Sequence, residues 1–225
     1  MLQIQNIDDN LIKACKNNNF NTVNDLLLNG ANIHYKNRGS SPIMIASSNG
    51  NIEIFELLLL NGANIHDKDD NGYNSLIGAT QRGHIKIIEL LLLHGANIRH
   101  KDCNGYSSLI YGTINGFFDV VKLLLLNDAN INDKTNEGYN SIMFAIINCN
   151  TEIVKLFLSY QCNIYDRNDY EKNCVDIAYE YDYIEIIELL KKMHLTTIII
   201  ILQELYVYND LDWSSFIDFN EYLVL

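Results

Sequence analysis

NGANIHDKDDNGYNSLI (residues 61–77) returns 33 positions later as HGANIRHKDCNGYSSLI (94–110) and again as NDANINDKTNEGYNSIM (127–143). A segment copied at a fixed period indicates one structural unit stacked on copies of itself. A catalytic site, in contrast, needs a few unlike groups that converge once. We therefore predict a repeat architecture for most of the chain.

Each repeat predicts two short helices followed by an extended segment, which we call a finger. The second helix is written IEIFELLLL (52–60), IKIIELLLL (85–93) and FDVVKLLLL (118–126), with apolar residues on almost every side, as expected for a helix packed between neighbours. The first helix follows a polar residue suited to an N-cap, which accepts hydrogen bonds from exposed helix amides. These N-cap positions are Ser41, Asn74, Ser107, Asn140 and Asn173, and Pro42 takes a first helical position, where proline is tolerated.

Six helix pairs follow from this register, and they must stack because one pair alone cannot bury its apolar face. The predicted fold class is an all-α solenoid over residues 1–192 with projecting hairpin-like fingers. Residues 1–28 form its amino-terminal cap and 175–192 its terminal helix pair. Other residues replace repeat glycines from Asp128 onward, so we expect the later repeats to be less regular. The predicted pairs span 11–28, 43–60, 76–93, 109–126, 142–159 and 175–192.

The two most regular copies are GSSPIMIASSNGNIEIFELLLLNGAN (39–64) and GYNSLIGATQRGHIKIIELLLLHGAN (72–97). Both resemble the ankyrin repeat, and the resemblance extends from about residue 11 to residue 192. It implies a non-enzymatic module that binds a protein partner through a concave surface, made by the fingers and the exposed edges of the first helices. Partner identity does not follow from the resemblance, because specificity resides in surface residues that vary over a common frame.

Candidate partner-binding residues lie where the resemblance places that concave surface. Tyr73, Tyr106 and Tyr139 share one repeat column, and Tyr111 and Phe144 share another, so stacking of the repeats would align five aromatic side chains. Aromatic residues are favoured interface anchors; alternatively, the tyrosines only cover the neighbouring finger. The flanking variable positions are Gln81, Arg82, Ile114, Asn115, Ile147 and Asn148, and the two isoleucines would favour binding where they face solvent.

Composition excludes several other partners. The 225 residues are 48% hydrophobic and 20% charged, and the formal net charge is −12. A grip on nucleic-acid phosphates or anionic lipid would need a basic patch, which the sequence lacks. We expect a protein partner, no nucleic-acid or membrane partner, and a monomeric chain.

The five cysteines are odd in number and contain no CxxC spacing, so neither a disulfide framework nor a zinc knuckle is predicted. A reducing, cytoplasmic location fits this pattern. The start lacks the features of a secretory signal, and the longest apolar run, 195–202, is too short to cross a bilayer. The wealth of asparagine and isoleucine suggests an AT-rich genome, as in some large DNA viruses or intracellular bacteria, for which the location would be the host cytoplasm.

Metal, cofactor and catalytic sites are not predicted. Histidines and a cysteine do gather in or beside adjacent fingers, at His66, His94, His100 and Cys103, but they lack the short local spacing of zinc ligands, and solvated loop side chains are the alternative. The aspartates of DKDDNG (67–72) lack the spacing of a calcium loop and its final Glu. A phosphate loop is absent, and no nucleophile with a base is distinguished from its repeat equivalents.

Two further features have alternative interpretations. Leu60, Leu93 and Leu126 stand where ankyrin repeats commonly carry a charged residue; they form either a second apolar ridge that supports self-association or, as we favour, part of a half-buried groove. The extension 193–225 departs from the repeat. It either covers the last repeat or docks a second protein, with an apolar stripe at Trp213, Phe216, Phe219 and Tyr222. Docking would make the chain an adaptor, recruiting for instance a ubiquitin-ligase component; a subunit of an enzyme catalytic elsewhere is a third alternative.

Overall fold

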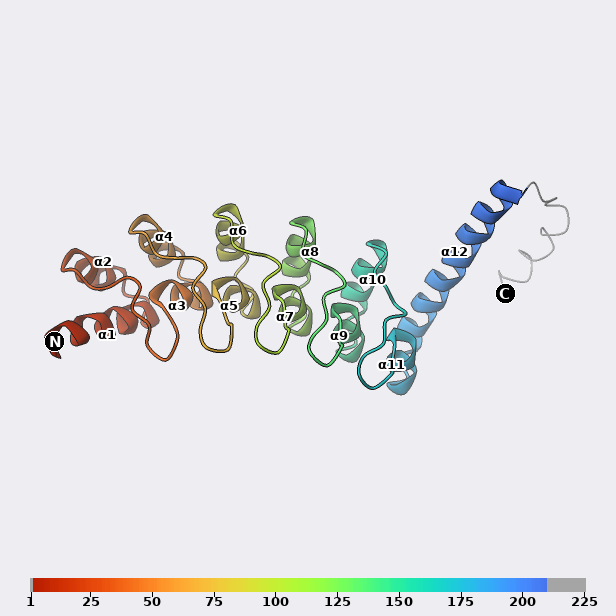
Figure 1. Cartoon of the computed structure of the whole chain (residues 1–225), viewed down its shortest axis with the longest axis horizontal. Coiled ribbons are helices and arrows are strands. Elements are labelled where there is room, and N and C mark those ends of the chain that lie inside the picture. The colour runs from red at the N-terminus through yellow and green to blue at the C-terminus, as the bar shows by residue number, and fades with distance from the viewer. Residues whose placement is uncertain (1, 210–225) are drawn as a thin grey trace.

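Two parallel rows of helices make up the molecule, seen in a computed structural model that describes residues 2–209 (Figure 1). This part of the chain holds twelve helices and isolated β-bridges, without a strand. The first helices are α1 (Leu2–Lys16), α3 (Pro42–Asn49), α5 (Ser75–Gln81), α7 (Ser108–Ile114), α9 (Ser141–Ile147) and α11 (Cys174–Glu180). The second helices are α2 (Phe20–Leu28), α4 (Ile52–Leu60), α6 (Ile85–Leu93), α8 (Phe118–Leu126), α10 (Thr151–Ser159) and α12 (Ile184–Asn209). The all-α solenoid is thus confirmed.

Side chains at the predicted N-caps start most of the first helices. Asn74 Oδ1 accepts a hydrogen bond from the amide of Ile77 (2.9 Å), and Asn140 does the same for Met143 (3.1 Å). Asn173 forms a full capping box with Asp176. Ser41 is the exception, because its side chain makes no cap hydrogen bond although it holds the N-cap position. The proline that follows presets the first helical φ, so this helix start depends less on a cap.

The core runs as one continuous cluster between the two rows. Each first helix packs on the next first helix and on its own second helix. In α4, for example, Ile54, Phe55 and Leu58 are fully buried. Burial on both sides explains why these helices are apolar around most of their circumference.

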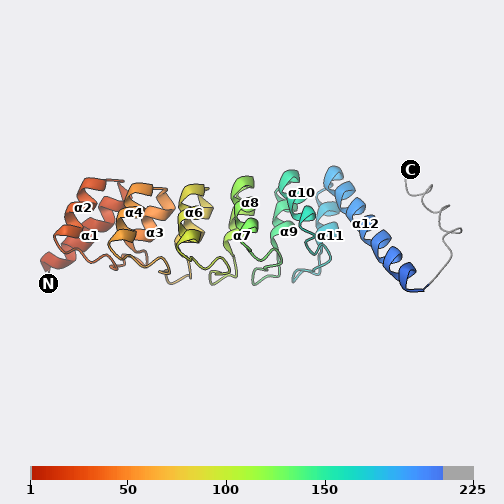
Figure 2. The same ribbon diagram turned by 90° about the horizontal axis from the view of Figure 1, so that it is seen from above.

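The fingers project to one side of the rows (Figure 2) and are tied to one another at the same period as the repeat. A backbone amide of one finger donates to a carbonyl of the preceding finger, and a lysine of one finger pairs with an aspartate of the next. The amide bonds are Cys103 to Asn71 (2.9 Å), Asn136 to Asn104 (2.9 Å) and Asp169 to Glu137 (3.0 Å), and the closest ion pairs are Lys101 with Asp133 and Lys134 with Asp166, each 3.0 Å. Neighbouring fingers are therefore held at a fixed separation.

The expected irregularity after Asp128 is not found in the helices, although the last finger lacks the β-bridge that each of the four earlier fingers has. Helices α9, α10 and α11 have the lengths of their earlier counterparts, 7, 9 and 7 residues. The residues that replace glycine adopt the same left-handed backbone: φ is 63° at Asp128, 52° at Cys149 and 53° at Gln161. Packing of the repeats therefore imposes the backbone even where a side chain makes that conformation costly.

Both ends of the solenoid differ from the predicted helix pairs. Helix α1 begins at Leu2 instead of residue 11, and α12 continues beyond residue 192 as one helix of 26 residues that projects from the last repeat (Figure 1). The predicted stripe of Trp213, Phe216, Phe219 and Tyr222 lies outside the described residues. Within residues 2–209, none of the helices combines the length and hydrophobicity that crossing a bilayer requires.

The five cysteines are free thiols in two different environments. Burial raises the pKa of Cys15 and of Cys162 to about 12, and it also raises the pKa of Cys174. Cys103 and Cys149 are exposed. Because the thiolate is the reactive species, the two classes should differ in reactivity.

We expect an aromatic disulfide reagent at pH 8 to modify Cys103 and Cys149 rapidly in the native chain, and Cys15, Cys162 and Cys174 only after unfolding in guanidinium. The measurement is the number of cysteine thiols modified in each condition, counted from the aromatic thiol that the reagent releases. The Cys103→Ser, Cys149→Ser variant is the control and should show no rapid phase. Rapid modification of a third thiol in the native chain would contradict the burial described above.

Candidate functional site

Six aromatic rings form a continuous row along the fingers and the neighbouring first helices. We call this row the aromatic ladder. Its order in space is Tyr73, Tyr111, Tyr106, Phe144, Tyr139 and Tyr170, with successive ring centroids 5.5, 5.4, 5.8, 5.5 and 6.2 Å apart. Such spacings are those of interacting aromatic pairs. Rings from fingers and helices alternate along most of the row, so each of the four inner rings has neighbours from two different elements.

Turns within the fingers position the backbone of the first three finger tyrosines of the ladder. Asp69 Oδ1 accepts from the amide of Tyr73 (2.8 Å), and Asp102 Oδ1 accepts from that of Tyr106 (2.9 Å). The Thr135 hydroxyl accepts a hydrogen bond from the amide of Tyr139 at 3.2 Å. Short polar side chains stabilise turns by such local hydrogen bonds. The repeat therefore fixes where each ring begins, before any contact between rings is made.

Asp102 also connects the finger row to the helix row. Its second carboxylate oxygen, Oδ2, accepts a hydrogen bond from the Tyr111 hydroxyl at 2.8 Å, and the aspartate itself is buried. Burial raises the pKa of Tyr111 well above its usual value, and this hydrogen bond, the second cause, raises it further. Tyr111 is therefore a neutral, anchored ring, the second of the ladder.

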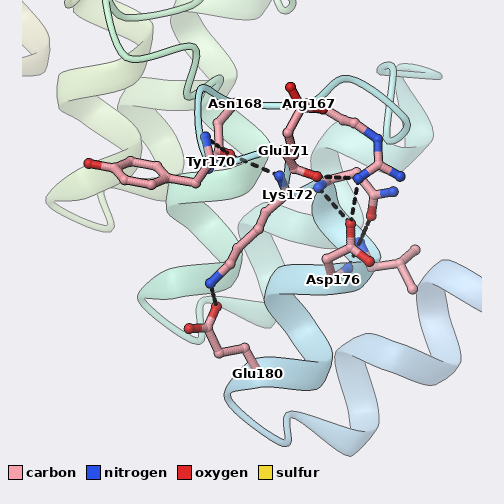
Figure 3. A network of polar contacts seen from close by, with 9 residues as sticks. Arg167, Asn168, Tyr170, Glu171, Lys172, Asp176 and Glu180 are labelled. Atoms are coloured by element: carbon pink, nitrogen blue, oxygen red, sulfur yellow. Dashed lines mark hydrogen bonds and ion pairs between the residues drawn. The ribbon is translucent and has the colours of Figure 1, made fainter.

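A polar network holds the last finger and the ring of Tyr170 (Figure 3). Asn168 Oδ1 accepts from the amides of Tyr170 and Lys172, both at 3.0 Å. Two ion pairs then fasten this finger to α11: Arg167 Nη1 lies 3.2 Å from Asp176 Oδ2, and Lys172 Nζ lies 2.6 Å from Glu180 Oε2. Tyr170 projects away from these contacts toward the ladder.

A shallow, open pocket of about 420 Å³ lies at this end of the ladder, and we call it the ring pocket. Four ladder rings surround it together with one carboxylate, one amine and one aliphatic side chain. Its lining consists of Tyr106, Glu137, Tyr139, Phe144, Ile147, Tyr170 and Lys172.

Comparison with known families agrees with this geometry. A family model described as ankyrin repeats (3 copies) matches residues 11–102, 43–135 and 109–198. The chain belongs to the ankyrin repeat family. A search of curated proteins found no match.

Within this ankyrin solenoid, the structure brings all five predicted aromatic residues together. Of the flanking positions, Gln81, Arg82, Asn115 and Asn148 are exposed at the ends of their first helices. Ile114 and Ile147 are half-buried, and the backbone carbonyl of each accepts a hydrogen bond from the next repeat: Asn148 Nδ2 donates to Ile114 at 3.0 Å, and the Tyr183 hydroxyl donates to Ile147 at 3.5 Å.

Tyr170 and Glu137 were not predicted as site residues. The repeat column of Tyr73, Tyr106 and Tyr139 continues to Lys172, while Tyr170 stands two residues earlier, in the column of Glu137. Only the turn of the last finger brings Tyr170 back to the row, at 6.2 Å from Tyr139. A repeat alignment alone does not show that approach.

The favoured interpretation of the outer leucines is wrong. Leu60, Leu93 and Leu126 are 86, 80 and 65% exposed, so they do not fill a half-buried groove. Leu28, at the same position of α2, is 78% exposed. These side chains stand at the last residue of their helices, where the next repeat does not cover them. They form an apolar row on the second helices, separate from the ladder.

The histidines near the fingers take part in other contacts. His100 Nε2 lies 2.6 Å from the carbonyl oxygen of Gly72, which joins two fingers. In the described part of the chain, no group of three or more His, Cys, Asp or Glu side chains is placed to hold a metal ion. Asp69 Oδ1 accepts a hydrogen bond from the amide of Tyr73 in its own finger, and Asp67 Oδ1 lies 3.9 Å from Lys36 Nζ.

The buried phenol of Tyr73, the first ring of the ladder, should make the free energy of unfolding depend on pH. Burial raises the pKa of Tyr73 from 10.0 to about 12. Between these two pH values the folded chain binds more protons than the unfolded chain, so the free energy of unfolding falls as pH rises through this window. The contribution is fully present below pH 10.

Tyr73→Phe removes this titration. We expect its unfolding free energy, measured by urea denaturation at pH 8, 10 and 11, to fall less steeply above pH 10 than that of the wild type. The difference between the two proteins should be constant between pH 8 and pH 9. Parallel curves up to pH 11 would show that the Tyr73 phenol is not protected.

Proposed function

We propose that the aromatic ladder is the surface by which this chain binds a protein partner. Ankyrin repeats are, in general, protein–protein interaction modules. The observation that supports this surface is the unbroken row of six rings, whose members Tyr73, Tyr106 and Tyr139 are half-buried and therefore keep part of each ring accessible. Large aromatic side chains of this kind dominate the binding energy of protein interfaces.

Rigidity supports the same conclusion. Turn hydrogen bonds fix the finger backbone, the fingers are joined by amide bonds and ion pairs, and neighbouring rings restrict one another. Little conformational entropy is then lost when a partner binds, so more of the contact energy appears as affinity. The broad, preorganised face on the concave side of the solenoid suits binding to a folded or an extended part of a protein partner.

Other classes of function have less support. The net charge of −12 opposes binding to nucleic acid or to anionic lipid. Four of the ladder phenols are held neutral by burial, since the pKa values of Tyr73, Tyr106, Tyr111 and Tyr139 are all raised, so these four offer no activated nucleophile or base. We therefore propose a non-enzymatic, monomeric module. Its free thiols fit the reducing cytoplasm.

The direct test is the double variant Tyr106→Ala, Tyr139→Ala. Proximity labelling in the native cell first identifies a partner, and calorimetry then measures its affinity for the purified chain. We expect affinity to fall at least tenfold, because the anchors of two neighbouring fingers are lost while the helices remain intact. Tyr160→Ala, Tyr179→Ala is the matched control, since both tyrosines are exposed (41 and 53%) and lie outside the ladder. Equal affinity of both variants would refute the choice of surface.

One observation favours the adaptor as a second candidate function. Helix α12 projects beyond the last repeat (Figure 2), which places its far end away from the ladder and available to another protein. Affinity purification with and without residues 196–225 separates the two functions. Loss of one set of captured proteins with retention of another supports an adaptor, and identical sets argue for a simple binder.

A further inference from the structure

The ring pocket contains a carboxylate without a counter-ion. Among the described residues, Glu137 forms no ion pair, although its side chain is exposed and lines the pocket. Burial raises the pKa of Tyr106 and of Tyr139, and the negative charge of Glu137 contributes to the rise in both. The carboxylate is therefore close enough to both rings to act on the same occupant as they do.

The amine that lines the same pocket does not neutralise this charge. Lys172 Nζ pairs with Glu180 Oε2 of α11 at 2.6 Å (Figure 3). Arg167 of the same finger is likewise engaged with Asp176. Both cations of the last finger, Arg167 and Lys172, are thus already paired with carboxylates of α11.

Charge along the fingers is uneven. In residues 2–209, the finger cations without an ion pair are Arg38, Lys68 and Arg99, all in the first three fingers, where Asp69, Asp70 and Asp102 also lack an ion pair and offset them. The last two fingers carry Glu137, Asp169 and Glu171, which are exposed and have no ion pair in that part of the chain. The Asp169 carboxylate lies close to Gly138, beside Glu137. The ring pocket therefore stands at the acidic end of the ladder.

Ring faces and a carboxylate together favour a cation. An ammonium or guanidinium group over an aromatic face is attracted by the negative face of the ring, and an adjacent carboxylate adds a charge-assisted hydrogen bond. A neutral apolar side chain would use the rings but would leave Glu137 without a partner. An acidic side chain would be repelled by Glu137, Asp169 and Glu171.

We propose that the ring pocket binds one lysine or arginine side chain, presented by a basic segment of the protein partner. This proposal rests on the proposed function, since it assigns chemistry to one end of the same ladder. Glu137 pairs with the cation, while Tyr106, Tyr139, Phe144 and Tyr170 surround its stem and head. The basic segment lies over the last two fingers, and neutral parts of the partner lie over the first three, whose unpaired charges cancel.

The test begins with random 16-residue peptides displayed on phage and selected against the full chain. Peptides that also bind the Tyr106→Ala, Tyr139→Ala variant are removed, so that only ladder-dependent peptides remain. Fluorescence anisotropy then measures the affinity of synthetic copies. In each, the shared lysine is replaced by norleucine or the shared arginine by citrulline, which removes the charge and retains the length.

We expect the neutral replacement to weaken binding to the wild type at least tenfold. Glu137→Gln should weaken binding of the cationic peptide by a similar factor and leave the affinity for the neutral peptide unchanged. Glu56→Gln is the matched control, because it removes the same charge from an exposed position of α4; it should alter neither affinity more than twofold.

Each contrary outcome has a distinct meaning. Ladder-dependent peptides without a shared cation, or equal loss from the neutral replacement in wild type and Glu137→Gln, would overturn the cation proposal and leave the ladder as a binding surface. Peptides that bind the chain but never depend on Tyr106 and Tyr139 would overturn the proposed function, and the cation proposal with it.

Discussion

Leu58→Ala is expected to lower the free energy of unfolding by about 2–5 kcal/mol. Leu58 is fully buried in α4, within the core cluster that joins neighbouring repeats. Truncation removes apolar contacts and leaves a cavity between elements that relax only in part. Because each repeat is stabilised by its neighbours, the loss weakens the stacking of the adjacent helix pairs as well. Guanidinium denaturation followed by circular dichroism at 222 nm gives the change.

Leu60→Ala is the matched control, since it makes the same chemical change two residues later in the same helix. Leu60 is 86% exposed, so we expect a change within about 0.5 kcal/mol. Leu91 and Leu93 of α6 repeat the comparison, at 0 and 80% exposure. If Leu58→Ala and Leu60→Ala cost the same, then α4 is turned differently about its axis than described here.

The middle of the solenoid was predictable because several copies report on the same structure. The helix pair predicted at 43–60 is found as α3 (Pro42–Asn49) and α4 (Ile52–Leu60). Local signals agree at this position: every copy has an N-cap residue and an apolar helix, and the earlier copies also have a glycine that ends it. Agreement among five registers removes the ambiguity of any one short apolar segment.

The ends were less predictable because they have no second copy. Helix α1 begins nine residues before the predicted pair, at Leu2, and α12 continues seventeen residues beyond residue 192. Outside the repeat, helix length depends on local propensity and on solvent exposure of one face, and neither marks a boundary there. Exposure of Leu60 was missed for a related reason. The repeat assigns a residue to a helix end, but the packing of the next unit decides whether it is covered.

The ladder was predictable in part. Tyr73, Tyr106 and Tyr139 recur at a step of 33, so any stacked arrangement aligns them. Tyr170 breaks that step, and its approach to Tyr139 depends on the network that holds the last finger. The chemistry of Glu137 depends on which cations are already paired, and that is a property of the folded chain alone.

Gly105→Ala is expected to cost about 3 kcal/mol, the second large effect. Gly105 has φ of +81°, where an L side chain adds strain of about 1–2 kcal/mol. A Cβ there would also lie only 2.7 Å from Asn136 Oδ1 and 2.8 Å from Asn136 N, in the next finger. Overpacking of this kind costs about 1–3 kcal/mol more. The contact falls on backbone, which cannot rotate away.

Gly95→Ala isolates the backbone term, because Gly95 has nearly the same φ, +83°, and a Cβ there meets nothing within 4 Å. We expect it to cost about 1 kcal/mol, so its melting temperature should lie between those of the wild type and Gly105→Ala. The crowded variant should also weaken partner binding although Gly105 is not a ladder residue. The clash displaces the Asn136 amide from Asn104, which widens the separation of the fingers that carry Tyr106 and Tyr139. Equal melting temperatures for the two variants would show that the fingers yield freely, and a freely yielding face would not present a rigid ladder.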